Sequence, residues 1–371
     1  MTVVFAGGGT GGHLYPAIAI ADALSARGVR IEFIGSAQRL EAQIVPKAGY
    51  PLHAISAHPL PRRPSFSLLR AVVHNLHGTL QSLRVLAQTR PNLVVATGGY
   101  VCFPVAVAAR IRRFSLRERA RIVLLEPNAA PGLTARLLAP MVDEIWGECG
   151  GFGATARAKC RATGVPVRAS LREPRPRAEA AARFGLDPGR ATLLAIGGSQ
   201  GARTLNDALL AAWESGFIPP GWQVLALTGA AGYERVAVAA RAESEVPFAV
   251  RPYVDDMGDA YALADLVLAR AGASTLSELA ALAKPAILVP YPYATEAHQS
   301  ANARRFESAG AAVVATDEEL KAGRLAELLA QVTAPAALAL LREGVKSLQG
   351  DDPLERILAR VDLLSRGISP E

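Results

Sequence analysis

One local pattern occurs in each half of this chain: an apolar strand runs into a turn of glycines that opens a helix. Residues 3–12 read Val-Val-Phe-Ala-Gly-Gly-Gly-Thr-Gly-Gly, and residues 193–202 read Leu-Leu-Ala-Ile-Gly-Gly-Ser-Gln-Gly-Ala. Such a turn lets backbone N–H groups and the positive end of the helix dipole approach a phosphate closely. Two copies therefore predict two α/β domains, each with a turn that faces phosphates.

Elsewhere, short apolar runs alternate with helical patterns, which is the β-α-β rhythm of a parallel sheet. The strands expected in the first half are Val3–Phe5, Ile31–Ile34, Leu93–Ala96, Ile122–Leu125 and Glu144–Trp146. Those expected in the second half are Leu193–Ile196, Gln223–Leu227, Phe248–Val250, Leu266–Leu268, Ala286–Val289 and Ala312–Val314. We expect two doubly wound domains, at residues 1–165 and 166–345, and a C-terminal helical segment, residues 346–371, that packs back across their junction.

Composition excludes several classes of protein. Of 371 residues, 50% are hydrophobic and 20% are charged, a balance that can bury a sizeable core and does not match a disordered chain. The cysteines form no C-x-x-C pair, which argues against a disulfide framework and a structural zinc site. The N-terminus lacks a basic segment, and glycines and a proline interrupt the longest uncharged stretch. We therefore expect no signal peptide, no transmembrane helix and a cytoplasmic location.

Positive charge is concentrated in the first half. Residues 1–165 contain 19 Lys and Arg against 8 Asp and Glu, a net charge of +11, whereas the remainder contains 21 against 25, a net charge of −4. A basic domain attracts nucleic acid, phosphorylated substrates or a membrane surface. The amphipathic segment Ser67–Gln88 fits either a helix on an anionic bilayer or the core face of an ordinary surface helix. The Arg-rich segment Arg110–Arg121 fits a solvated loop or an anion-contacting surface.

The first glycine turn also satisfies the dinucleotide pattern G-x-G-x-x-G at Gly7, Gly9 and Gly12, with Glu32 about twenty residues further on. An NAD-dependent oxidoreductase is therefore one hypothesis. The turn ends in His13, which at the opening of a helix could act as a general base or could simply bond to the backbone.

Polar side chains follow another strand of the first half. Glu126 and Asn128 come directly after the apolar run at residues 122–125. The carboxyl ends of strands are where open α/β sheets bind ligands. Asn128 could instead cap the helix that follows.

Three segments of the second half carry further polar groups. Arg270–Glu278 opens a helix with small residues, and Glu278 could accept hydrogen bonds from a ribose diol. Residues 290–299 gather polar groups of the kind that bind hydroxyl-rich ligands such as sugars. The acidic cluster Asp255–Asp259 is expected to start a helix, and no convincing divalent-metal site is apparent.

At least eight motifs occur in one fixed order: Gly7–His13, Thr97–Tyr100 with Pro104, Glu126–Asn128 with Gly132, Thr163–Arg168, Gly197–Gly201 with Asn206, Asp256–Met257, Arg270–Glu278, and His298–Gln299 with Asn302. In this order, from about Val3 to Val314, the chain resembles the MurG family of bacterial cell-wall glycosyltransferases. Eight ordered motifs are far more specific than any one of them.

The resemblance implies a GT-B fold, in which two Rossmann-like domains face a cleft. It implies inverting, metal-independent transfer of N-acetylglucosamine (GlcNAc) from UDP-GlcNAc to the C4 hydroxyl of N-acetylmuramic acid (MurNAc) in lipid I, undecaprenyl-pyrophosphoryl-MurNAc-pentapeptide. The product would be lipid II for peptidoglycan synthesis. No cofactor and no nucleic acid are implied, and the enzyme would sit peripherally on the anionic cytoplasmic face of the cell membrane. The alternatives are the NAD-dependent oxidoreductase and a non-catalytic sugar-nucleotide-binding protein.

The resemblance also implies roles for particular residues. Those that would bind the donor are Asn128, Arg168, Ser199, Gln200, Val254, Met257, Glu278, His298 and Gln299. Those that would bind the acceptor are Thr10, Gly11, Gly12, Gly98, Gly99 and Tyr100. His13 is the first choice of general base and Glu126 is the second.

The chain departs from the family pattern in places. Where the family usually has His-Glu-Gln-Asn, residues 125–128 read Leu-Glu-Pro-Asn, so only the Glu and the Asn can carry a role there. Cys102 stands where serine is common, and Val165 stands where asparagine is common. The Arg110–Arg121 segment is also longer than the usual connection.

Overall fold

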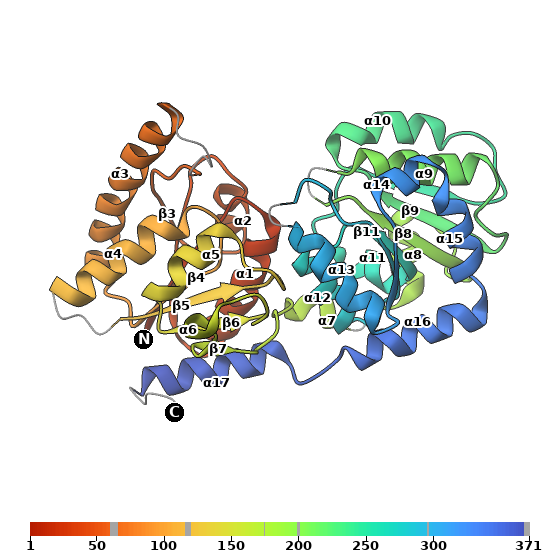
Figure 1. Cartoon of the computed structure of the whole chain (residues 1–371). Coiled ribbons are helices and arrows are strands. Elements are labelled where there is room, and N and C mark those ends of the chain that lie inside the picture. Colours follow the sequence, from red (N-terminus) through yellow and green to blue (C-terminus); the bar gives the residue numbers. More distant parts are fainter. Residues whose placement is uncertain (60–65, 116–119, 174, 199–200, 295–296, 367–371) are drawn as a thin grey trace. The chain divides into compact units, whose positions relative to one another are not determined.

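The computed structural model describes residues 1–59, 66–115, 120–173, 175–198, 201–294 and 297–366. The chain divides into two compact units: the first contains residues 1–168 and 351–371, and the second contains residues 169–350 (Figure 1). Each unit is built on one parallel sheet flanked by helices, which confirms the predicted α/β fold class.

The described strands of the first unit lie in the order β3-β2-β1-β4-β5-β6-β7. Their bounds are β1 (Thr2–Ala6), β2 (Arg30–Gly35), β3 (Leu52–Ala54), β4 (Leu93–Ala96), β5 (Arg121–Glu126), β6 (Glu144–Gly147) and β7 (Cys160–Arg161). Because β1 pairs with β2 on one side and with β4 on the other, the strand order reverses between β1 and β4. Open α/β sheets bind ligands at such a switch point, outside the carboxyl ends of the strands.

Helices cover both faces of this sheet. They are α1 (Gly11–Ala26), α2 (Glu41–Lys47), α3 (Phe66–Thr89), α4 (Cys102–Ser115), α5 (Leu133–Leu138), the 3₁₀ turn η1 (Ala139–Met141), α6 (Ala154–Arg157) and α17 (Pro353–Ser365). Successive strand residues point to opposite faces. Val3 and Phe5 therefore pack with α1, α2 and α17, whereas Val4 and Ala6 pack with α3, α4 and α5.

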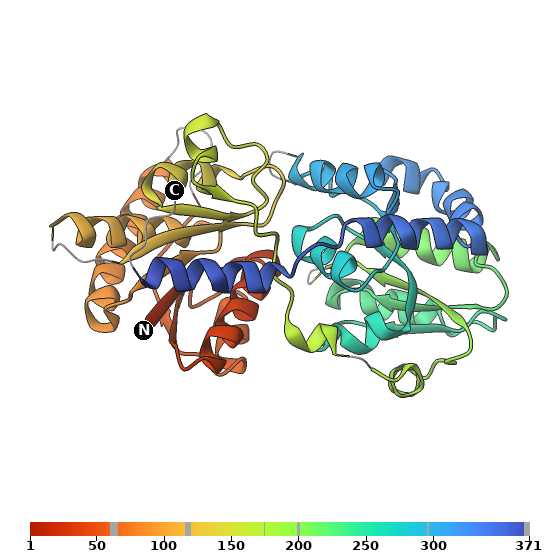
Figure 2. The ribbon, with the colours of Figure 1, turned by 90° about the horizontal axis from the view of Figure 1, so that it is seen from below.

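The last helix, α17, belongs to the first unit although the whole second unit precedes it in the sequence. It lies beside α1 (Figure 2). Ile357 and Val361 on its buried face join the core that α1 covers. Arg360 of the same helix forms a buried ion pair with Glu144 of β6. The C-terminal helix thus covers part of one face of this sheet, as the helices that connect its strands do.

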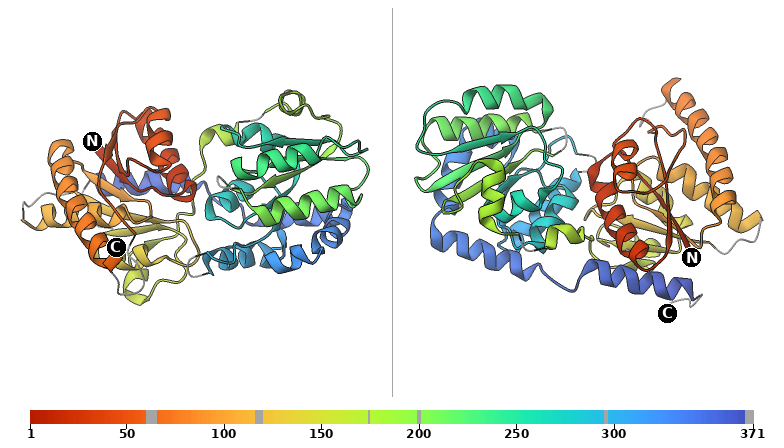
Figure 3. Two further views of the ribbon diagram at one scale, coloured as in Figure 1. Left: turned by 90° about the horizontal axis from the view of Figure 1, so that it is seen from above. Right: turned by 180° about the vertical axis from the view of Figure 1, so that it is seen from behind.

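The long helix α3 buries small and polar side chains and exposes large apolar ones. Its buried positions include Ala71, Asn75, Gly78 and Ser82. Its exposed positions include Leu69, Val72, Val73, Leu76 and Leu80. The alternative that this stripe is an ordinary core face is therefore wrong for residues 69–80, although Leu86 near the end of the helix belongs to the core. The helices α3 and α4 lie side by side (Figure 3).

The described strands of the second unit lie in the order β10-β9-β8-β11-β12-β13. Their bounds are β8 (Ala191–Ile196), β9 (Trp222–Leu227), β10 (Phe248–Arg251), β11 (Ala264–Ala269), β12 (Ala286–Leu288) and β13 (Ala312–Val314). Since β8 lies between β9 and β11, this sheet has its own switch point beside the second glycine turn.

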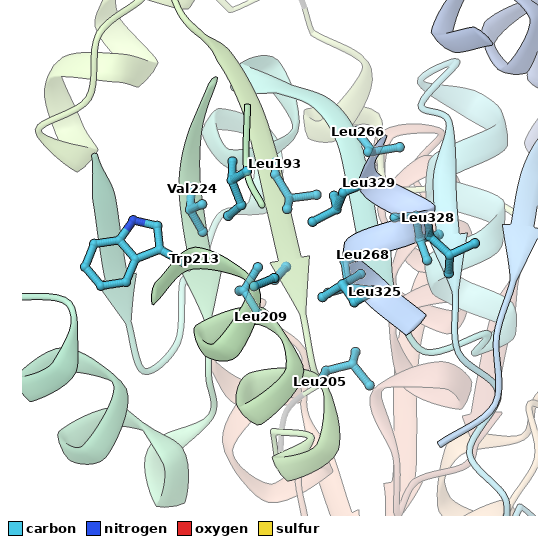
Figure 4. Close-up of a cluster of buried hydrophobic side chains, with 14 of the residues drawn as sticks. Leu193, Leu205, Leu209, Trp213, Val224, Leu266, Leu268, Leu325, Leu328 and Leu329 are labelled. Atoms are coloured by element: carbon cyan, nitrogen blue, oxygen red, sulfur yellow. The ribbon is translucent and has the colours of Figure 1, made fainter. Parts of the chain in front are cut away.

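The helices of the second unit are α7 (Ala169–Arg172), α8 (Arg177–Phe184), α9 (Arg203–Glu214), α10 (Ala230–Ala239), α11 (Met257–Leu263), α12 (Ala273–Ala281), α13 (His298–Ser308), α14 (Asp317–Lys321), α15 (Arg324–Val332) and α16 (Pro335–Ser347). Leucines of α9 and α15 pack with Leu193 and Leu268 of the sheet to form a continuous core (Figure 4). No single described helix is long and apolar enough to cross a membrane, although α15 and α16, bent by 87°, have that length and composition together.

Candidate active site

Apart from Arg168, the predicted site residues of the first unit lie at the carboxyl ends of three strands, β1, β4 and β5. Residues 7–13 follow β1, residues 97–100 follow β4, and Glu126 and Asn128 stand at the end of β5. Because β4 pairs with both β1 and β5, these segments meet at one edge of the sheet. The structure therefore brings residues that are far apart in the sequence together beside the switch point.

The two turns are packed backbone against backbone. A Cβ atom added at Gly99 would lie 2.6 Å from the carbonyl oxygen of Gly8, and one added at Gly98 would lie 2.3 Å from Nδ1 of His13. Gly98 and Gly99 also have φ angles of +107° and +79°, which glycine adopts readily. The imidazole of His13 therefore rests against the backbone of the turn that follows β4.

Four further predicted residues belong to this group. Thr10 is exposed at the N-cap position of α1, where its hydroxyl makes no capping bond to the described residues. Gly11 and Gly12 begin α1, and half-buried Tyr100 packs against the core of the α4 face. A hydroxyl group and the first amides of a long helix are thus presented at one edge, an arrangement that favours an anionic group.

Glu41 is not among the residues predicted from the sequence, yet it shapes this site. It is fully buried at the start of α2. Its carboxylate accepts hydrogen bonds from the backbone N–H of Gly9 at 2.9 Å and of Ser36 at 3.0 Å. The 32-residue separation from Gly9 leaves no local sequence pattern that would have revealed this contact.

Glu126 and Asn128 form a polar pair at the end of β5. One carboxylate oxygen of Glu126 accepts from the backbone N–H of Asn128 at 3.0 Å and from its Nδ2 at 2.9 Å. Asn128 does not cap the next helix, because the N-cap of α5 is Gly132, so that alternative is wrong. Burial raises the pKa of Glu126, which brings the carboxylate closer to the range of an effective base at neutral pH.

The raised pKa of Glu126 predicts a pH-dependent stability difference. Because the folded-state pKa exceeds that of the unfolded chain, the wild type loses stability as the pH rises from the unfolded value through the folded value. Glutamine keeps an acceptor for both Asn128 donors without a charge. We therefore expect the stability of Glu126→Gln relative to the wild type to increase as the pH rises above about 4.5, the pKa of a glutamate in the unfolded chain. Urea unfolding across this range measures it, and a pH-independent difference would contradict the expectation.

Glu32 does not occupy the position that a dinucleotide-binding domain requires. It lies within β2, short of the carboxyl end of that strand. Its carboxylate is bound by Arg30 Nε at 2.8 Å and lies 2.8 Å from His53 Nε2. A ribose needs this carboxylate at the carboxyl edge of the sheet. The dinucleotide interpretation of the first glycine turn is therefore wrong.

Arg168 is the last residue of the first unit before the chain enters the second. Its guanidinium carbon lies 4.3 Å from the centre of the Tyr15 ring, a cation–π contact that joins it to α1. A Cβ atom added at Gly11 would lie 3.0 Å from the same ring. Two of the predicted donor residues, Asn128 and Arg168, thus belong to the unit that carries His13.

In the second unit, Glu278 is a half-buried residue of α12. Its Oε2 accepts a hydrogen bond from the hydroxyl of Tyr261 at 2.7 Å. Tyr261 is buried in α11 and was not predicted from the sequence. Val254 and Met257 lie close to Asp256, whose side chain caps α11 as predicted.

His298 and Gln299 are the first two residues of α13, so polar groups do gather at the start of this helix. Gln299 Oε1 accepts from the backbone N–H of Tyr291 at 2.9 Å. Ala297 before them has a φ angle of +51°, a conformation that alanine rarely adopts and that clusters at functional sites. Gln299 thus joins the start of α13 to Tyr291, shortly after β12.

Arg270, which follows β11, fixes the loops at this edge. Its guanidinium pairs with Asp317 of α14, and its Nη1 donates to the carbonyl oxygen of Val289 at 3.2 Å. Its guanidinium carbon also lies 5.5 Å from the centre of the Tyr291 ring. Arg270 therefore positions the residues that directly follow β12.

The second glycine turn joins β8 to α9. Ser199 and Gln200, predicted to contact a diphosphate, lie outside the described residues. Gly198 and Gly201 beside them have φ angles of +80° and +76°. Within the described part of the chain, no side chain caps the twelve-residue helix α9 that follows.

Two carboxylates of the acidic cluster Asp255–Asp259 form ion pairs with an arginine side chain. Arg175 pairs with Asp256 at 2.7 Å and with Asp259 at 3.1 Å. Across the residues that the structure describes, no group of three His, Cys, Asp or Glu side chains could hold a metal ion.

Two parallel α/β units, each with a glycine turn at its switch point, are the architecture of GT-B glycosyltransferases. The sequence profile of the glycosyltransferase family 28 N-terminal domain matches residues 3–146. That of the family 28 C-terminal domain matches residues 192–344. The chain belongs to glycosyltransferase family 28, and it is an enzyme.

Relatives refine this assignment. A protein of Halothermothrix orenii, 40% identical with 90% of each chain covered, is named UDP-N-acetylglucosamine–N-acetylmuramyl-(pentapeptide) pyrophosphoryl-undecaprenol N-acetylglucosamine transferase. One of Desulforudis audaxviator with the same name is 39% identical, covering 98% of this chain and 99% of its own. The crystal structure of Acinetobacter baumannii MurG shares the fold, with a TM-score of 0.74 and 24% identity over 98% of this chain and 99% of that one. The resemblance to the MurG family is confirmed, and the oxidoreductase and non-catalytic alternatives are wrong.

Proposed function

We propose that this enzyme transfers GlcNAc from UDP-GlcNAc to the C4 hydroxyl of MurNAc in lipid I and so makes lipid II for peptidoglycan synthesis. The observation that carries the proposal is the similarity, over nearly the whole chain, to relatives named for this transfer. The polar residues at the carboxyl edges of both sheets support it, because each edge offers groups that suit one substrate.

In this proposal the first unit binds lipid I. The acceptor pyrophosphate and sugar lie against Thr10, the first amides of α1 (Gly11 and Gly12), and the turn formed by Gly98, Gly99 and Tyr100. His13 takes the proton of the C4 hydroxyl as that oxygen attacks the anomeric carbon. Its contact with the Gly98 backbone supports this role by fixing the imidazole beside both turns. Glu126, with its pKa raised by burial, is the second candidate for the base.

The second unit binds UDP-GlcNAc in this proposal. Glu278, oriented by Tyr261, accepts hydrogen bonds from the ribose, and Val254 and Met257 lie near the uracil. Ser199 and Gln200 contact the diphosphate. His298 and Gln299 contact the sugar, with Asn128 of the first unit.

The chemistry is a single displacement. The acceptor oxygen attacks the anomeric carbon from the face opposite UDP, which inverts that centre through an oxocarbenium-like transition state without a covalent enzyme intermediate. Negative charge develops on UDP, and the N-terminus of α9, the amides of its glycine turn and Arg168 would stabilise it without a metal ion.

Transfer of labelled GlcNAc from UDP-GlcNAc to a lipid I analogue tests this function. We expect product with an inverted anomeric centre, in the presence of EDTA as well as in its absence. Loss of transfer with EDTA would overturn metal independence alone, whereas no transfer under any condition would overturn the proposed reaction.

We further propose that the enzyme is peripheral to the cytoplasmic face of the cell membrane and contacts it through α3. Leu69, Leu76 and Leu80 are 65%, 61% and 59% exposed on one face of this helix, an apolar surface unusual for a protein facing only water. Phe114 of α4, a helix packed against α3, is also exposed, and the guanidinium carbon of Arg110 lies 5.7 Å from its ring centre. Apolar anchors with arginines suit an anionic bilayer.

Placing charges on this face should weaken membrane binding. We expect the double variant Leu69→Glu, Leu76→Glu to bind phosphatidylglycerol vesicles at least tenfold more weakly, since each leucine contributes about 1.5–3 kcal/mol when buried. Vesicle flotation measures this binding. Leu340→Glu, at a 73% exposed leucine of α16, is the matched control and should bind like the wild type. Equal binding by all three proteins would refute the contact.

A further inference from the structure

The proposed reaction leaves the buried carboxylate of Glu41 without a role. Its two oxygens bond to two different loops: one accepts from Gly9 after β1, and the other accepts from Ser36 after β2. Glu41 is also the first residue of α2, where the helix dipole stabilises a negative charge. This carboxylate thus ties together two loops at the edge of the sheet where the acceptor residues lie.

The first glycine turn is wrapped closely around this side chain. A Cβ atom added at Gly8 would lie 2.2 Å from the Glu41 carboxyl carbon, and one added at Gly35 would lie 2.8 Å from its Cγ. The backbone can approach the carboxylate this closely only because both positions are glycine. The path of the turn therefore depends on the length and hydrogen-bonding capacity of Glu41.

The position of this turn then fixes the position of His13 through a series of contacts. Glu41 sets the position of Gly8, and the Gly8 carbonyl oxygen lies against Gly99. Gly98, the neighbour of Gly99, forms the backbone surface on which the His13 ring rests. His13 also follows the same turn directly in sequence, so it is reached from Glu41 by two routes.

We propose that Glu41 is a positioning residue for transfer: it holds the first glycine turn in the conformation that aims His13 at the acceptor hydroxyl. The inference rests on the proposed function and assigns Glu41 no proton transfer of its own. A buried carboxylate that only stabilised the fold would affect unfolding and would leave the turnover of the folded enzyme unchanged.

The test compares Glu41→Gln and Glu41→Asp with Glu32→Gln, the same chemical change at a buried carboxylate of the same sheet outside the site. Glutamine keeps the length of the side chain but replaces one carboxylate oxygen with an NH₂ group, which cannot accept a hydrogen bond. It therefore keeps an acceptor for only one of the two backbone N–H groups, those of Gly9 and Ser36. Aspartate keeps the charge but is shorter. We expect both Glu41 variants to lower kcat for GlcNAc transfer by about 10- to 100-fold, since small misplacements of reacting groups have effects of this size.

Three controls distinguish positioning of His13 from lost donor binding and from unfolding. The dissociation constant for UDP, measured by calorimetry, should not change in any variant. Thermal unfolding identifies the folded fraction, and Glu32→Gln should keep the wild-type kcat per folded molecule. Wild-type kcat in Glu41→Gln, or a loss matched by Glu32→Gln, would overturn the inference. Absence of transfer by the wild type would instead overturn the proposed function.

Discussion

His13→Ala is expected to lower kcat for GlcNAc transfer by about 10²- to 10⁴-fold, the usual contribution of a positioned general base. The imidazole stands at the start of α1 and rests on the backbone of the turn that follows β4, so both elements fix its place. The dissociation constant for UDP should stay at the wild-type value, because the donor is proposed to bind mainly to the other unit. Transfer assays and UDP calorimetry measure the two quantities.

Glu126→Gln is the comparison that decides between the two candidate bases. If His13 is the base, Glu126→Gln retains most of the turnover, and the rise of kcat/KM with pH persists in it but is absent from His13→Ala. If Glu126 is the base, the rise disappears in Glu126→Gln. Unchanged turnover in His13→Ala would eliminate His13 from this role.

The strands were predictable because both sheets are parallel and covered on two faces, so their strands read as continuous apolar runs. Every strand expected from the sequence is present. Among the described strands, β3 (Leu52–Ala54) and β7 (Cys160–Arg161) were not expected, and both are short edge strands without a buried run. Their pairing is decided by the neighbouring strand, which local sequence does not show.

The edges that carry the site were also predictable, because turns after parallel strands share one side of a sheet. Glu41 and Tyr261 were not, because each acts through a contact with a residue distant in the sequence: Gly9 for Glu41 and Glu278 for Tyr261. The orientation of α3 was left open for a related reason. Its apolar stripe is the same whether it faces a core or the outside, and the side that packs inward is shown by burial in the structure, at Ala71, Asn75, Gly78 and Ser82.

Arg360→Ala is expected to destabilise the first unit by about 1.5–3 kcal/mol, because the buried carboxylate of Glu144 loses its hydrogen-bonded cation and keeps only the more distant Arg161. The Glu144 side chain is 2% exposed, and Arg360 Nε donates to its Oε2 at 3.1 Å. Trp146 Nε1 also donates to Glu144, at 2.8 Å, but carries no charge. Arg161 Nε lies 3.8 Å away, beyond hydrogen-bonding distance.

Amide hydrogen exchange in β6 and α1 measures this loss within the first unit, independently of the second. Asp362→Ala removes the partner of Arg27 from the same helix and is the matched control, since that pair is exposed and should contribute less than about 1 kcal/mol. Equally small losses in both variants would mean that α17 is held by its apolar face alone. A large loss confined to Arg360→Ala would mean that the chain's last helix is locked to the sheet by one buried charge pair, so that the first unit is complete only when the C-terminal segment has docked.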